Sequence, residues 1–154
     1  MDASSFRPTL LVGVGGTGCE IAERVHGRAM RMGMDGKRLT VIGVDTDVND
    51  MSRLKSIDVR NRIRTSSTDT IYHILSKHRE VEEEFCYPRD HLPDTLLNMR
   101  LIDGAAQIRM LSHLALYTSL KTGAVQNRVG DVLAQLGRHD GRTSFDGVIN
   151  ILVA

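Results

Sequence analysis

The chain has 154 residues, enough for one domain with a substantial buried core. Its apolar and charged fractions, 41% and 25%, are those of an ordinary globular protein, and a formal net charge of +1 gives no basis for binding nucleic acid. Every apolar run is far shorter than a membrane span and the N-terminus lacks a signal-peptide core, so we expect no membrane segment and a cytoplasmic location.

Two short, almost wholly apolar runs, at residues 10–14 and 39–44, are typical of strands buried on both faces of a parallel sheet. Between them, apolar residues recur at three- and four-residue spacing, which predicts an amphipathic helix. These residues are Ile21, Ala22, Val25, Ala29 and Met32. Turn residues at 33–37 end this helix. The segment therefore predicts a strand–helix–strand unit with a right-handed crossover.

The rest of the chain continues to alternate strands with helices. Residues 57–63 have the pattern of a short, half-exposed strand, and capping residues near Asp69 predict the start of a helix. Two further helical stripes lie within residues 108–118 and 125–136, and residues 148–153 predict another buried strand. This order predicts a Rossmann-like α/β fold, a doubly wound and mostly parallel sheet with helices on both faces.

A glycine-rich sequence, GVGGTG, joins the first expected strand to the first expected helix. It fits the pattern G-x-G-x-x-G, in which glycines let the backbone approach a phosphate and N–H groups at the helix start bind it. A strand before the motif and a helix after it are the context that the pattern requires. We therefore expect the loop to bind the phosphates of a nucleotide, with a merely tight turn as the alternative. The candidate residues are Gly13, Gly15, Gly16, Thr17 and Gly18.

The type of nucleotide depends on residues beyond this loop. Cys19 and Glu20 stand where a Walker A loop needs lysine followed by serine or threonine, which excludes a P-loop NTPase. A dinucleotide site needs an acidic residue about 20 positions after the glycines, but Asp45, which ends the second strand, lies 27 residues after Gly18. Asp47 adds a second carboxylate, and two carboxylates beside a phosphate favour a nucleotide with Mg²⁺ between them. The alternative is a solvated turn in which these side chains cap the next helix.

Three segments together resemble the tubulin and FtsZ superfamily, and most closely its bacterial tubulin-like members. The segments are VGVGGTG, VIGVDTD and DGAAQIR, the last opening a helix. The resemblance covers almost the whole chain in order and spacing, and FDGVINILVA matches the strand before the family's signature glycine loop.

This resemblance implies the N-terminal part of a GTP-binding domain that holds GTP or GDP with Mg²⁺. It also implies self-association into filaments or oligomers in the complete protein. Asp45 and Asp47 would lie near the metal. Carried over by position, the nucleotide-binding residues are Gly15, Gly16, Thr17, Gly18, Asp45, Thr46, Asp47, Gly104, Ala105 and Ala106.

The chain departs from the family's pattern in three places. VDTD replaces VNTD and adds a negative charge, and Ala106 adds a methyl group where glycine is commoner. The motif GGGTG[ST]G, expected just after Ala154, is absent together with the later domain whose acidic loop positions the attacking water in a neighbouring subunit. We therefore expect one nucleotide-binding α/β domain over residues 1–154, truncated at its C-terminus, with hydrolysis absent or very slow in this chain alone.

Other candidate residues have simpler interpretations. Arg109, on the first turn of the helix after DGAA, could reach a phosphate, or it could be a solvated arginine. His113 has no second ligand at metal spacing, so we expect no metal there. Cys19 and Cys86 make no disulfide framework, and Cys19 is expected to be a small packing residue beside the glycine loop. No residue is assigned a catalytic role.

Two other classes of function stay open. A Rossmann-type domain that handles NAD(P) or an adenylate would also have a GxGGxG loop, followed by a strand ending in D-x-D, as in VDTDV. A non-catalytic assembly module would instead self-associate through exposed apolar surface. A preference for ATP or NAD over GTP would favour the first alternative, and a stable monomer would count against the second.

Overall fold

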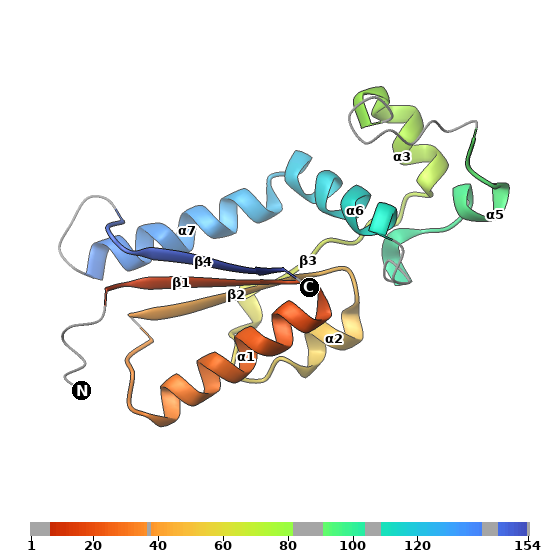
Figure 1. Cartoon of the computed structure of the whole chain (residues 1–154). Coiled ribbons are helices and arrows are strands. Elements are labelled where there is room, and N and C mark those ends of the chain that lie inside the picture. The colour runs from red at the N-terminus through yellow and green to blue at the C-terminus, as the bar shows by residue number, and fades with distance from the viewer. Residues whose placement is uncertain (1–6, 37, 82–90, 104–108, 140–144, 154) are drawn as a thin grey trace.

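The computed structural model of the chain describes residues 7–36, 38–81, 91–103, 109–139 and 145–153 (Figure 1). Its centre is a four-stranded sheet in which every pair of neighbouring strands is parallel. The strands are β1 (Thr9–Val14), β2 (Leu39–Asp45), β3 (Arg62–Arg64) and β4 (Val148–Val153). Their order across the sheet is β3-β2-β1-β4. β2 and β3 therefore lie on one side of β1, and β4 lies on its other side. The predicted α/β class with a parallel sheet is confirmed.

Helices cover both faces of this sheet (Figure 1). On one face lie α1 (Gly15–Arg31) and α2 (Val48–Arg53), and on the other lies α7 (Ala124–His139). The remaining elements are η2 (Val59–Asn61), α3 (Ile71–Lys77), α5 (Asp94–Leu97), η4 (Leu101–Asp103) and α6 (Arg109–Lys121). Within the described ranges, no helix combines the length and the apolar character that a membrane crossing requires.

The two central strands are apolar throughout because both of their faces are covered. Successive side chains of a strand point to opposite faces. Leu11 and Val41 accordingly belong to the core under α1 and α2, whereas Leu10 and Ile42 belong to the core under α7. All four side chains are buried. This double burial explains why β1 and β2 read as continuous apolar runs instead of alternating ones.

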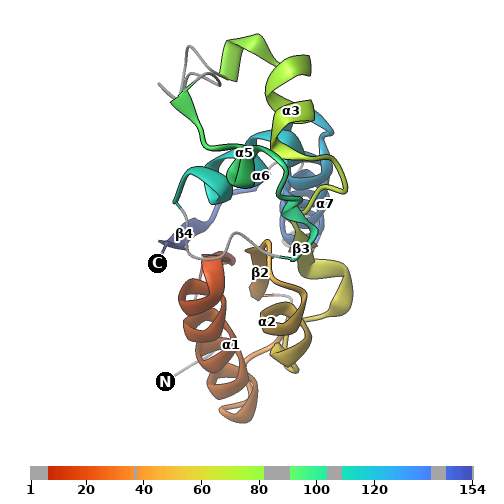
Figure 2. The same ribbon diagram turned by 90° about the vertical axis from the view of Figure 1, so that its right-hand side faces the viewer.

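A separate helical cluster lies beyond the carboxyl ends of the strands. In Figure 1, β1 and β4 point toward α3, α5 and α6, and Figure 2 views the same arrangement from the side of that cluster. The cluster has its own buried core, which includes Ile71, Ile74, Leu101, Leu111 and Leu114. The segments that follow β1 and β2 therefore lie at the edge of the sheet that faces this cluster.

The buried face of α1 differs from the predicted stripe. Gly18, Cys19 and Ala22 are buried, whereas Ile21 and Val25 are 44% and 45% exposed. Small residues let α1 approach the sheet closely, and this contact turns the larger side chains toward the flanks of the helix. The prediction was right for Ala22, which is buried, and for Ala29, which packs against the same core. It was wrong for the larger residues Ile21, Val25 and Met32, which are exposed.

β4 is a strand, as predicted, but it is not buried. In the parallel register, Ile149, Ile151 and Val153 pair with β1 residues that face α7, so all three share that face. They are 48%, 62% and 74% exposed. β4 is an edge strand in the described sheet, and the core under α7 is built over β1 and β2. The expectation of a buried strand at 148–153 was therefore wrong.

The predicted strand at 57–63 is shortened by a capping interaction. The Asp58 carboxylate accepts a hydrogen bond of 2.8 Å from the backbone N–H of Arg60, which starts the short helix η2. Such local bonds compete with strand pairing. Only Arg62–Arg64 then pairs with β2, as β3. Arg128 of α7 donates two bonds, of 3.0 and 2.6 Å, to Oδ1 of buried Asn61 and so joins α7 to this segment.

The contact between α1 and β1 predicts a large penalty for a side chain at Gly13. A Cβ there would lie 2.6 Å from the carbonyl oxygen of Gly18 and 2.8 Å from the Cα of Cys19, and these backbone atoms cannot move alone. We expect Gly13→Ala to lower the free energy of unfolding by about 2 kcal/mol or more in urea denaturation.

Gly130 of α7 provides the matched control. A Cβ at Gly130 would meet no atom within 4 Å. We expect Gly130→Ala to raise the free energy of unfolding by about 0.5–1 kcal/mol, because alanine favours a helix interior over glycine. Similar effects of the two substitutions would contradict the close approach of α1 to β1.

Candidate functional site

The first part of the site is the start of α1, which follows β1 without an intervening loop. Gly15 begins the helix with a φ of +76°, a conformation that glycine adopts without steric cost. Every residue of this first turn is described, and the turn has neither a side-chain cap nor an acidic residue. Its backbone N–H groups and the positive end of the helix dipole can therefore act on an anion.

The glycines of GVGGTG have different structural roles. Gly13 and Gly18 lie against each other, and a Cβ on Gly18 would come within 2.5 Å of the carbonyl oxygen of Leu152 in β4. These two glycines are explained by the packing of α1 on β1 and β4. Gly16 instead lies beside carboxylates, and Thr17 is exposed. Within GVGGTG, the N–H groups of Gly15, Gly16 and Thr17 lie in the first turn of α1, where no bond within the helix uses them.

The second part of the site is the carboxylate of Asp45, the last residue of β2. Asp45 is 9% exposed. Its Oδ1 accepts hydrogen bonds from the backbone N–H groups of Thr46 at 2.6 Å and Asp47 at 3.1 Å. Its Oδ2 is fully buried and has no hydrogen-bond partner among the described residues. A buried carboxylate oxygen without a partner is costly, which points to a ligand at this atom.

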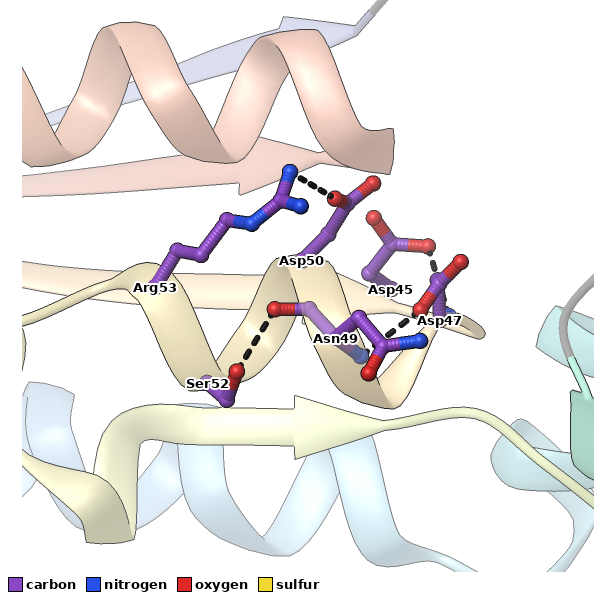
Figure 3. Close-up of polar contacts among 6 residues, drawn as sticks. All are labelled: Asp45, Asp47, Asn49, Asp50, Ser52 and Arg53. Atoms are coloured by element: carbon purple, nitrogen blue, oxygen red, sulfur yellow. Dashed lines mark hydrogen bonds and ion pairs between the residues drawn. The ribbon is translucent and has the colours of Figure 1, made fainter.

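Asp47 caps the next helix. Its Oδ1 accepts a hydrogen bond of 2.7 Å from the N–H of Asn49, which makes Asp47 the N-cap of α2 (Figure 3). The interpretation of VDTD as a capping sequence therefore holds for Asp47. Thr46 is buried, and its Oγ1 lies 3.4 Å from Oδ1 of Asp45.

Sequence reasoning missed a third carboxylate, that of Asp50 on the first turn of α2. Its Oδ2 lies 2.7 Å from the position that a Cβ on Gly16 would occupy, and Oδ2 of Asp45 lies 3.7 Å from the same position. Oδ1 of Asp50 pairs with Arg53 at 3.3 Å (Figure 3). The spacing D-x-x-D, a cap followed three residues later by an acid, was the signal that could have revealed it.

A hydrogen-bonded clamp fixes α1 to the segment after α2. The Glu23 carboxylate accepts bonds from the N–H groups of Ser56 at 2.6 Å and Ile57 at 3.2 Å. The Ser56 hydroxyl lies 3.2 Å from the Glu23 carbonyl and 3.1 Å from Nδ1 of His26. Burial lowers the pKa of His26, although the charge of Glu23 opposes that shift. The glycine turn and the carboxylates of α2 are thereby held in a fixed relation.

Cys19 lies under this turn as a packing residue. It is 1% exposed, and its Sγ is 3.3 Å from the carbonyl oxygen of Gly13 and 3.7 Å from that of Val44. Burial raises the pKa of the thiol to about 11, and the charges of Asp45 and Asp50 add to the effect. The thiol is therefore protonated and unreactive at neutral pH.

The third predicted segment is only partly described. Residues 104–106 and the side chain of Arg109 lie outside the described residues, and His113 is exposed on α6. In the described part of the chain, no group of three or more His, Cys, Asp or Glu side chains could hold a metal ion. A cation here would use one or two carboxylates and complete its shell with water or phosphate oxygens, as Mg²⁺ commonly does.

Comparison with known protein families identifies the family of this chain. The family model described as tubulin-like matches residues 10–154, which include β1 except for Thr9, the start of α1, β2 and all of β4. No curated protein and no solved structure matches the chain.

The buried thiol of Cys19 predicts a specific pH dependence of stability. Its pKa is raised from 9.0 to about 11, so between these values the folded chain keeps a proton that the unfolded chain releases. This contribution to stability is therefore complete below pH 9 and is lost as the pH rises toward 11. We expect a loss on the order of 2 kcal/mol in the free energy of unfolding, measured by urea denaturation at pH 8 and pH 11.

Cys19→Ala is the control, because other groups titrate in the same range. The variant should lose less stability than the wild-type chain between the two pH values, whatever its stability at pH 8. An identical pH dependence in the two proteins would contradict the raised pKa of Cys19.

Proposed function

Because the chain belongs to the tubulin-like family, we propose that it binds the phosphates of GTP or GDP at the start of α1, together with Mg²⁺. The resemblance of VGVGGTG, VIGVDTD and DGAAQIR to the tubulin and FtsZ superfamily implies GTP or GDP as the nucleotide. The observation that carries the proposal is the buried Oδ2 of Asp45, which has no partner among the described residues and lies beside the uncapped first turn of α1. The uncapped N–H groups of α1 can donate hydrogen bonds to a phosphate, and the neighbouring carboxylate oxygen can bind a cation. A phosphate paired with a cation therefore fits both groups.

The phosphates would be held mainly by backbone groups. Gly15, Gly16 and Thr17 supply N–H groups in the first turn of α1 that have no partner within the helix, and the helix dipole favours negative charge there. The resemblance implies that Thr46 and residues 104–106 also contact the phosphates, and Arg109 is a further candidate for such a contact. The cytoplasmic location expected from the composition belongs to the same proposal.

The local charge explains why a cation belongs in the site. Asp45, Asp47 and Asp50 place three carboxylates at the end of β2 and the start of α2. Arg53 pairs with Asp50, but its side chain is 78% exposed, so the pair is weakened by solvent. A nucleotide triphosphate without a cation would be repelled by this group of charges.

Titration calorimetry with GTP, GDP, ATP and NAD, each with Mg²⁺, is the direct test. We expect GTP and GDP to bind, because the family resemblance implies a guanine nucleotide and the start of α1 can hold its phosphates. A preference for ATP or NAD would favour the Rossmann-type alternative. The absence of heat with all four nucleotides would overturn the proposal.

A negative charge at position 17 should have opposite effects on the stability of the fold and on the affinity for phosphate. Thr17 is exposed on a first turn that has no acidic residue. Thr17→Glu should raise the free energy of unfolding by about 0.3–1 kcal/mol through the helix dipole. It should weaken GTP binding at least about tenfold, or 1.4 kcal/mol, because the carboxylate repels the phosphates. Thr17→Gln is the neutral control of equal size, and equal GTP affinity in the two variants would place the phosphates elsewhere.

We also propose that the chain self-associates, as its resemblance to the tubulin and FtsZ superfamily implies. The α7-facing side of β4 presents Ile149, Ile151 and Val153, which are between 48% and 74% exposed. An exposed apolar face on an edge strand is a common site of association. A second copy of the chain could cover this face.

Light scattering during size-exclusion chromatography tests the self-association. We expect the apparent mass of the wild-type chain to rise with concentration and Ile151→Lys to stay monomeric. Val59→Lys is the control, because Val59 is 72% exposed on η2, away from β4. A wild-type chain that stays monomeric at every concentration would contradict the proposal.

A further inference from the structure

We propose that Asp50 of α2, together with Asp45 of β2, supplies the protein's carboxylates to the cation that accompanies the phosphates. The inference rests on the proposed function and concerns which residues hold the cation. The motif itself pointed to Asp47 as the second carboxylate, whereas the geometry points to Asp50.

The two carboxylates meet beside Gly16. Oδ2 of Asp50 and Oδ2 of Asp45 lie 2.7 and 3.7 Å from the position of a Cβ on Gly16, so by adding the two distances they are at most about 6.4 Å apart. Figure 3 shows both side chains directed to the same region below the start of α1. One hydrated divalent cation can be shared by carboxylates at such a separation, directly or through a water.

One of these oxygens already lacks a partner. Oδ2 of Asp45 is fully buried without a hydrogen bond among the described residues, while Oδ1 of the same carboxylate accepts two backbone N–H groups. The carboxylate is therefore fixed in orientation with its free oxygen toward Gly16. A cation at this point would remove the cost of leaving that oxygen buried and unpaired.

Asp47 and Asp50 differ in what their carboxylates already do. Asp47 is engaged as the N-cap of α2 through its Oδ1. Asp50 uses Oδ1 for the exposed pair with Arg53, which leaves Oδ2 facing Gly16. The charges of Asp45 and Asp50 also both act on the thiol of Cys19, under the same turn. Asp45 and Asp50 therefore direct their charge to one place, the start of α1.

Glycine at position 16 keeps this place open. A Cβ there would lie 2.7 Å from Oδ2 of Asp50 and 3.7 Å from Oδ2 of Asp45, so a side chain at this position would crowd both carboxylates. Asp45 and Asp50 would hold Mg²⁺ through one or two carboxylate oxygens, and phosphate and water would supply the remaining ligands that Mg²⁺ prefers. The site would then join α2 to the nucleotide.

The test compares GTP affinity with Mg²⁺ and with EDTA in the wild-type chain, Asp50→Asn and Asp47→Asn. Asparagine caps helices as well as aspartate does, so Asp47→Asn removes a charge and keeps the cap of α2. We expect Mg²⁺ to strengthen GTP binding in the wild-type chain and in Asp47→Asn. In Asp50→Asn the Mg²⁺ effect should fall at least about tenfold. Binding without a cation should be unchanged or stronger in that variant, because one repelling charge is gone.

Electron paramagnetic resonance of Mn²⁺ gives a second readout. Mn²⁺ added with GTP should be bound by the wild-type chain and by Asp47→Asn, and largely free with Asp50→Asn. An unchanged Mg²⁺ effect in Asp50→Asn, or equal losses in the two variants, would overturn the assignment of Asp50. A wild-type chain that binds no GTP, with or without Mg²⁺, is a different outcome. It would overturn the proposed function itself and, with it, the assignment of Asp50.

Discussion

The close approach of α1 to the sheet is the constraint on which the rest of the site depends. Gly13 and Gly18 place backbone against backbone, and a Cβ at either position would meet main-chain atoms within 2.6 Å. Because α1 begins directly after β1, this contact holds the first turn of the helix at the carboxyl edge of the sheet. Asp45 ends the adjacent strand β2, so the helix start and the carboxylate become neighbours without any contact between side chains.

The resulting edge carries both signs of charge. The start of α1 offers N–H donors and a positive dipole end, while the end of β2 and the start of α2 offer carboxylates. A lone anion would be attracted by the start of α1 and repelled by the carboxylates. A lone cation would be attracted by the carboxylates and repelled by the start of α1. A phosphate paired with a cation satisfies both sides, which is why the geometry favours a nucleotide with its metal over a bare phosphate.

Much of this architecture could be predicted from the sequence, and the failures have physical causes. The apolar runs of β1 and β2 and the glycine motif between them predicted the parallel sheet because double burial and a tight turn leave local patterns. The packing face of α1 was predicted correctly at Ala22 but wrongly at Ile21 and Val25, because small residues make the contact with the sheet. The exposure of β4 depends on which other elements pack against it, and the residues of the strand itself do not indicate that. Asp50 was missed because its role appears only when α2 is packed beside Gly16.

The helical cluster of α3, α5 and α6 has a buried core made of residues separate from those of the sheet. Its cohesion is therefore local, and it can open at a lower free energy than the whole domain unfolds. A ligand seated at the sheet edge that also touched this cluster would make that opening costlier by its own binding free energy. Ligand binding at the sheet edge and protection of α3, α5 and α6 against local opening would then rise and fall together.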